Sequence, residues 1–500
     1  MTLSATTASA DEGAPAVSRG SSDALRFTLN GRAIDATGAD PNTTLLGWLR
    51  EHGYTGSKEG CAEGECGACA VAFVRPDREG ASRLVAVNGC LVLLGACAGQ
   101  EIFTVEGIGA HGLHEVQRAM VELGGSQCGY CTPGFVVSLF AEFYRRGRKD
   151  EGFDLESIAG NLCRCTGYRP IRDAGRGLPM VREGDPFASR LSSPAPAASA
   201  FTYRTSRQRT FHRPTRLRDA LAILAEHPDA AIVTGGTDLV VEMNQRHRRF
   251  DAILSLDAVE ELKSFEETDE GLSIGAGVPL SEVEARTHDT LPIFGELFEL
   301  FSSRLIRNRA TLGGNLGTAS PIGDSPPVLL CLDAIVDVDG PSGPRAIPID
   351  ALFTGYRTTQ LTPGELIVRV RIAKPFPDVA RFYKVSKRVH DDISCVAAGF
   401  SLRFDGGLVH TARLAYGGIA ATPIRAIAAE EALVGKPWSA RAVEDAKAKL
   451  SDAFTPMTDQ RGSAAYRTAM ITSLLDKLYS DTRDSQMRDS HPRETKVRDA

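Results

Sequence analysis

Cysteine spacing is the strongest chemical signal in this chain. Nine of its eleven cysteines lie between Cys61 and Cys165, where they form two groups. The first group reads C-x4-C-x2-C over Cys61, Cys66 and Cys69, and a further cysteine follows at a distance. This is the plant-type spacing for a 2Fe-2S cluster, whereas structural zinc prefers paired C-x2–4-C knuckles.

Glycines and a fourth thiol belong to the same pattern. Gly60, Gly64 and Gly67 would let the loop wrap closely around a cluster and aim backbone N–H groups at its sulfurs. Both Cys90 and Cys97 qualify by distance as the fourth ligand. Cys97 ends the apolar run LVLLGAC, which favours a buried, inert thiol at that position. The first group therefore predicts an iron–sulfur cluster, with the fourth ligand open on spacing alone.

The second group pairs a C-x2-C, Cys128 and Cys131, with a C-x-C, Cys163 and Cys165, thirty-one residues later. A dithiol oxidoreductase places its C-x-x-C after a strand at the start of a helix, but here helical periodicity precedes Cys128. A C-x-C pair is poor for structural zinc, whose knuckles need more reach between ligands. Four thiolates at helix ends could instead hold a second 2Fe-2S cluster. The residues alone favour that cluster only slightly over zinc.

Glycine-rich turns supply the next candidate sites. GIGAHG at 107–112 fits a dinucleotide-binding pattern but has no βαβ unit around it, so we reject it. AIVTGGTDL at 231–239 puts a Gly-rich turn after a buried strand, and 310–324 forms a second loop of small residues. Backbone N–H groups in such turns can cradle a pyrophosphate without Lys or Arg, and Asp324 could accept from a ribose or ribityl hydroxyl. The alternative is a pair of tight structural turns.

The secondary structure expected to position these residues changes along the chain, from strands with one short helix to helices alone. Residues 25–29 alternate apolar and polar before the turn pair Asn30–Gly31, which predicts a hairpin. Residues 43–53 predict a short helix capped by Thr. From His114 onward the apolar spacing becomes helical. Helices are expected over 116–123, 135–143, from Asp154 through Leu155, Ile158 and Leu162, and over 170–178.

Beyond the cysteines the chain mixes helices and strands. Residues 184–200 read as an extended linker, 213–228 as a helix and 231–233 as a buried strand. The first two dozen residues and the charged tail after Ser480 predict disorder. Net charge is −6, which gives no nucleic-acid footprint. The longest apolar run, 91–98, is too short for a membrane span.

No export signal is evident, and eleven cysteines in such a chain indicate a reducing compartment. We therefore expect a cytoplasmic protein.

QCGYCTPG and NLCRCTGYRPI, with both cysteine sets in this order, resemble the iron–sulfur half of the xanthine dehydrogenase / aldehyde oxidase family of molybdenum hydroxylases. The resemblance covers Leu25 to about Val181. It implies that one 2Fe-2S cluster is held by Cys61, Cys66, Cys69 and Cys90, and the other by Cys128, Cys131, Cys163 and Cys165. It also places Gln127 where relatives contact the pterin.

The Gly-rich loops resemble the FAD-binding domain of the same family, which is not a Rossmann fold. Residues 382–393 and 416–418 resemble its C-terminal flavoprotein domain. Tyr356 and Asp391 fall where the family approaches the flavin ring and nicotinamide. Gly236, Asp238 and 387–389 depart from the family pattern, which puts the final electron acceptor in doubt. The implied FAD residues are Ile232, Val233, Thr234, Gly235, Gly236, Thr237, Asp238, Leu239, Phe301, Thr311, Leu312, Gly313, Gly314, Asn315, Asp324, Ile367 and Lys384.

The resemblance implies an α+β multidomain fold. Its parts would be a β-grasp 2Fe-2S ferredoxin-like domain, a four-helix 2Fe-2S domain, an α+β FAD-binding domain of the molybdenum-hydroxylase flavoprotein type and a C-terminal α+β flavoprotein domain. The expected division is a disordered extension over 1–23, the ferredoxin domain over 24–110, the helical domain over 111–183, a linker over 184–203, the FAD-binding domain over 204–379, the C-terminal domain over 380–482 and a disordered tail over 483–500.

The family's single-chain members continue into a molybdopterin domain that does not follow here. The resemblance therefore implies the small, electron-transferring subunit of a two-subunit enzyme. A molybdopterin-binding large subunit, in a heterotetramer of two small and two large subunits, would oxidise hypoxanthine and xanthine to urate. Electrons would pass through the helical-domain cluster, the plant-type cluster and FAD to NAD+.

Three alternatives stay open. The chain could serve an aldehyde-oxidising sibling, act as a stand-alone NADH diaphorase, or be a non-catalytic iron–sulfur sensor. Neither nucleic acid nor a membrane is an expected partner.

Overall fold

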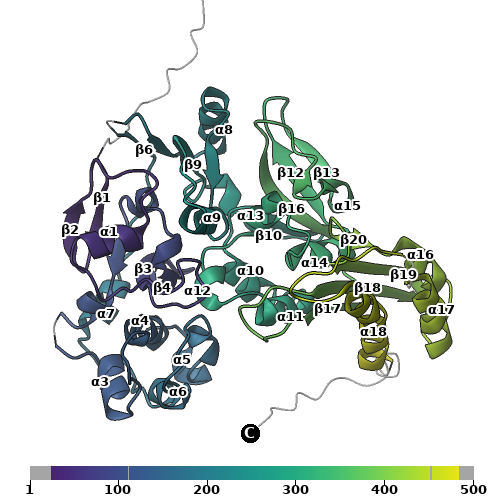
Figure 1. The fold of residues 1–500 in the computed structure, drawn as a ribbon, viewed down its shortest axis with the longest axis horizontal. Coiled ribbons are helices and arrows are strands. Elements are labelled where there is room, and N and C mark those ends of the chain that lie inside the picture. The colour runs from purple at the N-terminus through teal and green to yellow at the C-terminus, as the bar shows by residue number, and fades with distance from the viewer. Residues whose placement is uncertain (1–23, 111, 206, 451–452, 484–500) are drawn as a thin grey trace, which may run out of the picture.

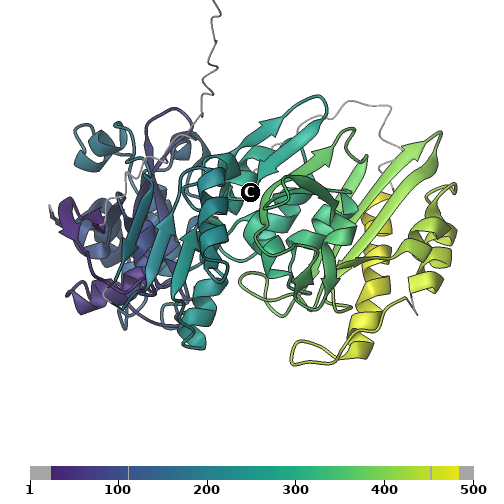
Figure 2. The same cartoon turned by 90° about the horizontal axis from the view of Figure 1, so that it is seen from above.

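The computed structural model describes residues 24–110, 112–205, 207–450 and 453–483. In Figure 1 the purple and blue parts, residues 24 to about 200, occupy one end of the molecule, and the yellow-green C-terminal part occupies the other. Figure 2, seen from above, shows the teal and green strands and helices between them. The prediction of disorder for 1–23 concerns residues outside the described ranges, and so does the part of the predicted tail over 484–500. The prediction of disorder after Ser480 is wrong at its start, because Asp481 and Thr482 end a helix and Arg483 is the C-cap of that helix.

The first domain is a five-stranded mixed sheet with strand order β2-β1-β5-β3-β4. Asn30 and Gly31 both have positive φ, as a type I′ hairpin turn requires, and they join β1 to β2 as predicted. The predicted helix after Thr44 is α1, with the Thr44 hydroxyl accepting from the Gly47 N–H. The elements are β1 (Arg26–Leu29), β2 (Arg32–Asp35), α1 (Leu45–Glu51), β3 (Ala70–Pro76), β4 (Ser82–Asn88), η1 (Gly89–Leu91), η2 (Leu94–Cys97) and β5 (Glu101–Phe103).

A helical domain packs against one face of this sheet. Its helices are α2 (Val105–Ile108), α3 (Glu115–Glu122), α4 (Thr132–Phe143), α5 (Arg148–Glu151) and α6 (Arg169–Arg176), with the 3-10 turn η3 (Leu155–Ile158). Asp154 caps η3, but the helix expected to reach Leu162 ends at Ile158. Leu162 is exposed, and its N–H donates instead to the carbonyl of Cys66, 3.0 Å away. A contact between domains therefore ends this helix early.

The segment predicted as an extended linker contains a helix, α7 (Pro186–Leu191). The Asp185 carboxylate caps it by accepting from two backbone N–H groups. Phe187 is buried against Phe103 and Phe140, with ring centroids 5.4 and 4.9 Å away. The small, Pro-rich composition predicted a spacer, but one aromatic side chain anchors part of the segment to the helical domain.

The remaining described residues form four further sheets, one of them the two-stranded sheet β14-β15. A four-stranded sheet, order β6-β7-β9-β8, is followed by an antiparallel five-stranded sheet, order β10-β11-β16-β12-β13, and an antiparallel four-stranded sheet, order β17-β18-β19-β20. The helix predicted from Arg213 begins only at Leu217, because Arg213 ends β7 and donates to the carbonyls of Ala96 and Ala98.

The strands are β6 (Phe201–Arg204), β7 (Thr210–Arg213), β8 (Ala231–Val233), β9 (Ala252–Ser255), β10 (Phe265–Glu267), β11 (Gly271–Gly275), β12 (Ile335–Asp339), β13 (Arg345–Pro348), β14 (Phe353–Gly355), β15 (Thr358–Thr359), β16 (Leu366–Ala373), β17 (Val379–Val385), β18 (Val396–Asp405), β19 (Leu408–Gly417) and β20 (Ile424–Arg425). The helices are α8 (Leu217–Glu226), α9 (Leu239–Gln245), η4 (Glu261–Lys263), α10 (Leu280–Thr287), α11 (Pro292–Leu300), α12 (Arg304–Arg307), α13 (Leu312–Thr318), α14 (Ser325–Cys331), α15 (Ile349–Leu352), α16 (Ile427–Leu433), α17 (Ala440–Leu450) and α18 (Ala464–Thr482).

One hydrophobic core crosses the boundary between the first domain and the β6–β9 sheet. Phe201, Tyr203 and Phe211 pack in the same cluster as Leu45 and the other apolar residues of the first sheet. The fit is close, because a Cβ on Gly95 would lie 2.7 Å from the Phe211 ring. Among the described helices, none combines the length and apolar character needed to cross a membrane.

Candidate functional site: two thiol groups beside two cavities

The first thiol group lies on the loop between α1 and β3, and Cys90 joins it from η1. A hydrogen bond between the thiols lowers the pKa of Cys61 to about 5 and raises that of Cys66. A hydrogen bond to Cys69, together with burial, raises the pKa of Cys90. The four thiols therefore stand as two pairs. A Cβ at Gly60 would lie 2.8 Å from the Cys66 sulfur, so a glycine at this position lets the backbone approach that sulfur closely.

The thiols of the second group form one connected set, in which Cys163 is hydrogen bonded to both Cys131 and Cys165. The sulfurs of Cys128 and Cys165 are 3.7 Å apart. Burial, together with a hydrogen bond to Cys163, raises the pKa of Cys131 to about 12. The two cysteines of the C-x-x-C thus each face a member of the C-x-C, and α3 precedes them where a dithiol enzyme would have a strand.

Hydrogen bonds tie the two thiol-bearing loops together. The Lys58 ammonium donates to the Gly129 carbonyl at 2.9 Å, and the Asn161 amide donates to the Gly67 carbonyl at 3.3 Å. A Cβ at Gly134, in the first turn of α4, would lie 2.1 Å from that same carbonyl oxygen. The loop of the first group therefore packs directly on the start of α4, beside the second group.

The arrangement of the thiols bears on whether each group could hold a zinc ion or a 2Fe-2S cluster. Over the described ranges, no three or more His, Cys, Asp and Glu side chains form a group that could hold a metal ion. A zinc ion would need four ligands around one centre, whereas a 2Fe-2S cluster takes four thiolates, two at each iron. Each group gathers four thiols, the number that a 2Fe-2S cluster takes. Cys97 takes no part: it is buried, and burial raises its pKa to about 12, as expected of an inert thiol.

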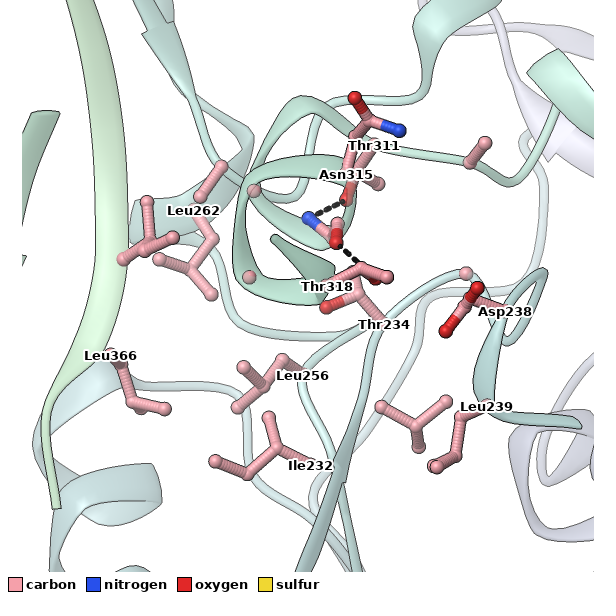
Figure 3. A pocket seen from close by; sticks show the side chains of 18 of the residues that line it. Ile232, Thr234, Asp238, Leu239, Leu256, Leu262, Thr311, Asn315, Thr318 and Leu366 are labelled. Carbon is pink, nitrogen blue, oxygen red and sulfur yellow. Dashed lines mark hydrogen bonds between the residues drawn. The ribbon is translucent and has the colours of Figure 1, made fainter. Parts of the chain in front are cut away.

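The first cavity, of about 400 Å³, lies between the turn after β8 and the start of α13. Figure 3 shows its polar part, with Asp238, Asn315 and Thr318, and its apolar part, with Ile232 and Leu366. Among the described residues no Lys or Arg lines this cavity, so a phosphate placed there would meet backbone N–H groups, which is the arrangement that the sequence analysis expects.

Glycines allow the two loops of this cavity to meet. A Cβ at Gly235 would lie 2.0 Å from the Arg309 carbonyl oxygen, and Gly236 has a φ of +81°. Only glycine adopts both positions without strain. Thr311 caps α13 by accepting from the Gly314 N–H at 3.0 Å (Figure 3).

The second cavity, of about 370 Å³, lies where the first domain meets the rest of the chain. Phe301, Asp324 and Lys384 line it on one side, and residues 63–65, between the cysteines of the first group, line it on the other. The Lys384 ammonium is 2.8 Å from Asp324, and Ser394 donates to the other carboxylate oxygen. Asp324 therefore already accepts at both oxygens, and it orients Lys384 inside the cavity.

Asp391 is the most perturbed carboxyl of the second cavity. Burial and the nearby Glu65 raise its pKa to about 6. Its Oδ1 accepts from Ser302 at 3.4 Å, whereas its buried Oδ2 has no hydrogen-bond partner within the part of the chain that the structure describes. A buried, unpartnered carboxylate oxygen in a cavity is a candidate contact for a ligand that donates hydrogen bonds.

The structure gathers most of the predicted flavin residues but not all of them. Residues 232–239, Thr311, 313–315 and Ile367 line the first cavity, and Asn315 is hydrogen bonded to Ser325, the residue after Asp324. Leu312 is buried and lines neither cavity.

Two predicted residues lie elsewhere. Tyr356 is 62% exposed and lines neither cavity. Gln127 is exposed beside Cys128 and also lines neither cavity. Sequence reasoning also missed residues that do line them: Leu256, Leu262, Thr318, Glu63, Glu65, Arg357, Ile393 and Arg461. Glu63 and Glu65 could have been found, because they lie within the C-x4-C loop.

The fold and these sites define an iron–sulfur flavoprotein. Residues 27–94 match the 2Fe-2S iron-sulfur cluster binding domain, and residues 104–176 match the 2Fe-2S binding domain. Residues 203–375 match the FAD binding domain in molybdopterin dehydrogenase, and residues 381–482 match the CO dehydrogenase flavoprotein C-terminal domain. The expected multidomain α+β fold is thereby confirmed.

Similarity to known proteins identifies the family within this class of iron–sulfur flavoproteins. A chain of the Cu,Mo-CO dehydrogenase in its cyanide-inactivated form is 30% identical with a TM-score of 0.51, over 53% of this chain and 94% of that one. Xanthine dehydrogenase of Drosophila subobscura is 33% identical and aldehyde oxidase 2 of Cavia porcellus 30%, over 91% and 92% of this chain. The chain belongs to the molybdenum hydroxylase family, of the xanthine dehydrogenase and CO dehydrogenase type. It spans about two fifths of the length of those two curated relatives (39% and 40%).

Proposed function

We propose that this chain is the electron-transferring subunit of a xanthine dehydrogenase, linking a molybdopterin-containing large subunit to NAD+. Two 2Fe-2S binding domains and an FAD-binding domain support an electron-transfer role within the family. The resemblance to xanthine dehydrogenases over 91% of this chain supports the choice of substrate.

One observation carries the proposal. The loop that bears Cys61 and Cys66 also forms a wall of the second cavity through residues 63–65. A cluster held by that loop and a flavin ring held beside Phe301 would share this wall. When bound, the clusters would supply one-electron transfer and FAD would supply hydride transfer; the protein contributes their placement and electrostatic surroundings.

The chain's own residues would act by binding and orientation. The Gly-rich turns of the first cavity would hold the pyrophosphate of FAD through backbone N–H groups. Lys384, held by Asp324, and Asp391, with its unpartnered oxygen, would orient the flavin in the second cavity. We assign the first cluster to Cys61, Cys66, Cys69 and Cys90, and the second to Cys128, Cys131, Cys163 and Cys165.

The second thiol group would face the partner. Cys128 and Cys165 are exposed, and so are Tyr130, Leu162 and Tyr168 around them. Exposed apolar side chains gathered near a redox group are typical of an interaction surface. We place the molybdopterin subunit there, with Gln127 as a pterin contact, in an assembly of two small and two large subunits.

The test is an assay of the chain purified with its partner. We expect two 2Fe-2S clusters and one FAD per chain, and NAD+ reduction driven by hypoxanthine or xanthine. Reduction driven by an aldehyde, with no response to purines, would instead support the aldehyde-oxidising alternative, which the likeness to aldehyde oxidase 2 keeps open. A chain that purifies alone, binds no partner and still passes electrons from NADH to a dye would show a diaphorase.

A further inference from the structure

The four-residue helix α12 lies where the FAD-binding region meets both thiol-bearing domains. Leu305 packs in the core of the helical domain, and a Cβ at Gly64 of the first cysteine loop would lie 2.7 Å from Ile306. Arg304 forms an ion pair with Asp154 of the helical domain at 3.3 Å. Figure 1 shows α12 beside β4 of the first domain. This helix therefore docks one region against two others.

Arg307, the last residue of α12, is fully buried and uses every nitrogen of its guanidinium. Nε donates to Glu284 of α10 at 3.2 Å, and Nη2 donates to Glu156 of the helical domain at 3.0 Å. Nη1 donates to the carbonyls of Phe301 and Ser302 at 2.9 and 3.4 Å. A buried cation persists when carboxylates compensate it, and one of these two carboxylates belongs to another domain.

The two carbonyls belong to the wall of the second cavity, because Phe301 and Ser302 both line it. Ser302 has a φ of +52°, a conformation that a residue with a side chain adopts only when its surroundings impose it. Its hydroxyl also bonds Asp391. The carboxylate of Glu156 lies 4.0 Å from His390, the residue before Asp391. A continuous set of polar contacts thus joins the helical domain to the cavity wall.

We propose that Arg307 is a positioning residue that makes the shape of the flavin cavity depend on the docked helical domain. The inference rests on the proposed function, because it takes the second cavity as the flavin site. With Glu156 in place, the guanidinium is compensated and holds the Phe301–Ser302 carbonyls. Without Glu156, the guanidinium loses one of its two counter-charges. Its hydrogen bonds to the Phe301 and Ser302 carbonyls then weaken, so FAD binds less tightly.

The test is the dissociation constant for FAD, measured by flavin fluorescence on the full chain after FAD removal with both clusters intact. We expect Arg307→Met to raise it by at least about 10-fold, and Glu156→Gln to raise it less but in the same direction. Because both changes act on one contact, the double variant should bind FAD no more weakly than Arg307→Met alone. Arg304→Met, which cuts a neighbouring ion pair but touches no cavity carbonyl, should stay within about 2-fold of the unmodified chain.

A positioning role and a merely structural one predict different results. Arg307→Lys keeps the buried charge but reaches fewer acceptors, so it should restore thermal stability without restoring FAD affinity. If Arg307→Met does not fold, Glu156→Gln and Arg307→Lys carry the same test. Unchanged FAD affinity in both, effects that simply add, or an equal loss in Arg304→Met would each overturn the proposal. An unmodified chain that binds no FAD would overturn the proposed function instead.

Discussion

The two thiol groups each hold four cysteines but differ in how far their most exposed and most buried members reach solvent. Cys69 and Cys90 are each 2% exposed and lie behind a loop that forms a cavity wall. Cys128 and Cys165 are exposed, with apolar side chains around them. This difference agrees with the proposed roles, in which the first group would pass electrons to the flavin of this chain and the second would receive them from a partner subunit.

Removing one ligand from each group should separate these roles most strongly. Cys163→Ser should remove one cluster signal in electron paramagnetic resonance and lower xanthine-driven NAD+ reduction by at least about 100-fold, because a cluster ligand is lost. NADH-to-dye activity should persist, since the flavin cavity lies on the other group. Cys90→Ser should impair both activities, because the cluster proposed for the first group would lie beside the cavity proposed for the flavin.

Cys97→Ala is the matched control for those variants, because Cys97 is a buried thiol outside both groups. It should keep both cluster signals and both activities. Loss of a cluster in Cys97→Ala, or two intact clusters in Cys163→Ser, would show that the ligand assignment is wrong.

The second largest effect should come from the contact between the two thiol-bearing loops, and it should appear as a loss of stability. Gly134→Ala places a methyl group 2.1 Å from the Gly67 carbonyl oxygen, so the two loops must separate. We expect a loss of about 1–3 kcal/mol in the free energy of unfolding, the usual cost of overpacking. Urea denaturation measures it. Gly295→Ala, also within a helix but with open space around its Cβ, should be neutral or stabilising by up to about 1 kcal/mol.

Asp391 should give the smallest effect and one that depends on pH. Its folded-state pKa, about 6, is above its ordinary value of 3.8, so the folded chain binds the proton more tightly than the unfolded chain. Stability from this group is present at low pH and is lost as pH rises through 6. Asp391→Asn should therefore remove about 1 kcal/mol of the decline in unfolding free energy between pH 5 and pH 7. Identical pH profiles for both proteins would contradict this assignment.

Local signals predicted the elements best. The Asn30–Gly31 turn, the Thr44 cap and the apolar spacing of α4 each depend on residues close in sequence, and all three are confirmed. The failures come from distant contacts. The predicted helix stops before Leu162, whose N–H donates to a carbonyl almost a hundred residues earlier in the chain. The predicted linker contains Phe187, which packs against two aromatic rings of other segments.

The two cavities differ in the same respect, because local sequence signals indicated the first cavity but not the second. Gly-rich turns after strands indicated the first cavity, because glycine has a local conformational reason to occur there. The wall of the second cavity combines Glu65 with Asp391, more than three hundred residues apart, and no local pattern joins them. Tyr356 was placed by resemblance alone and lies in neither cavity.

The shared core of the first domain and the β6–β9 sheet has a consequence for synthesis on the ribosome. Residues 24–110 carry a complete sheet, yet the core that contains its apolar residues also includes Phe201, Tyr203, Phe211 and further residues of the β6–β9 region. At ordinary translation rates that segment emerges on the order of 10 s later. Until that segment has emerged, the apolar residues of the first domain that belong to this core would lack their partners from the β6–β9 region. A fragment cut after residue 110 would lack those partners permanently, so the folding unit extends well beyond the sequence domain.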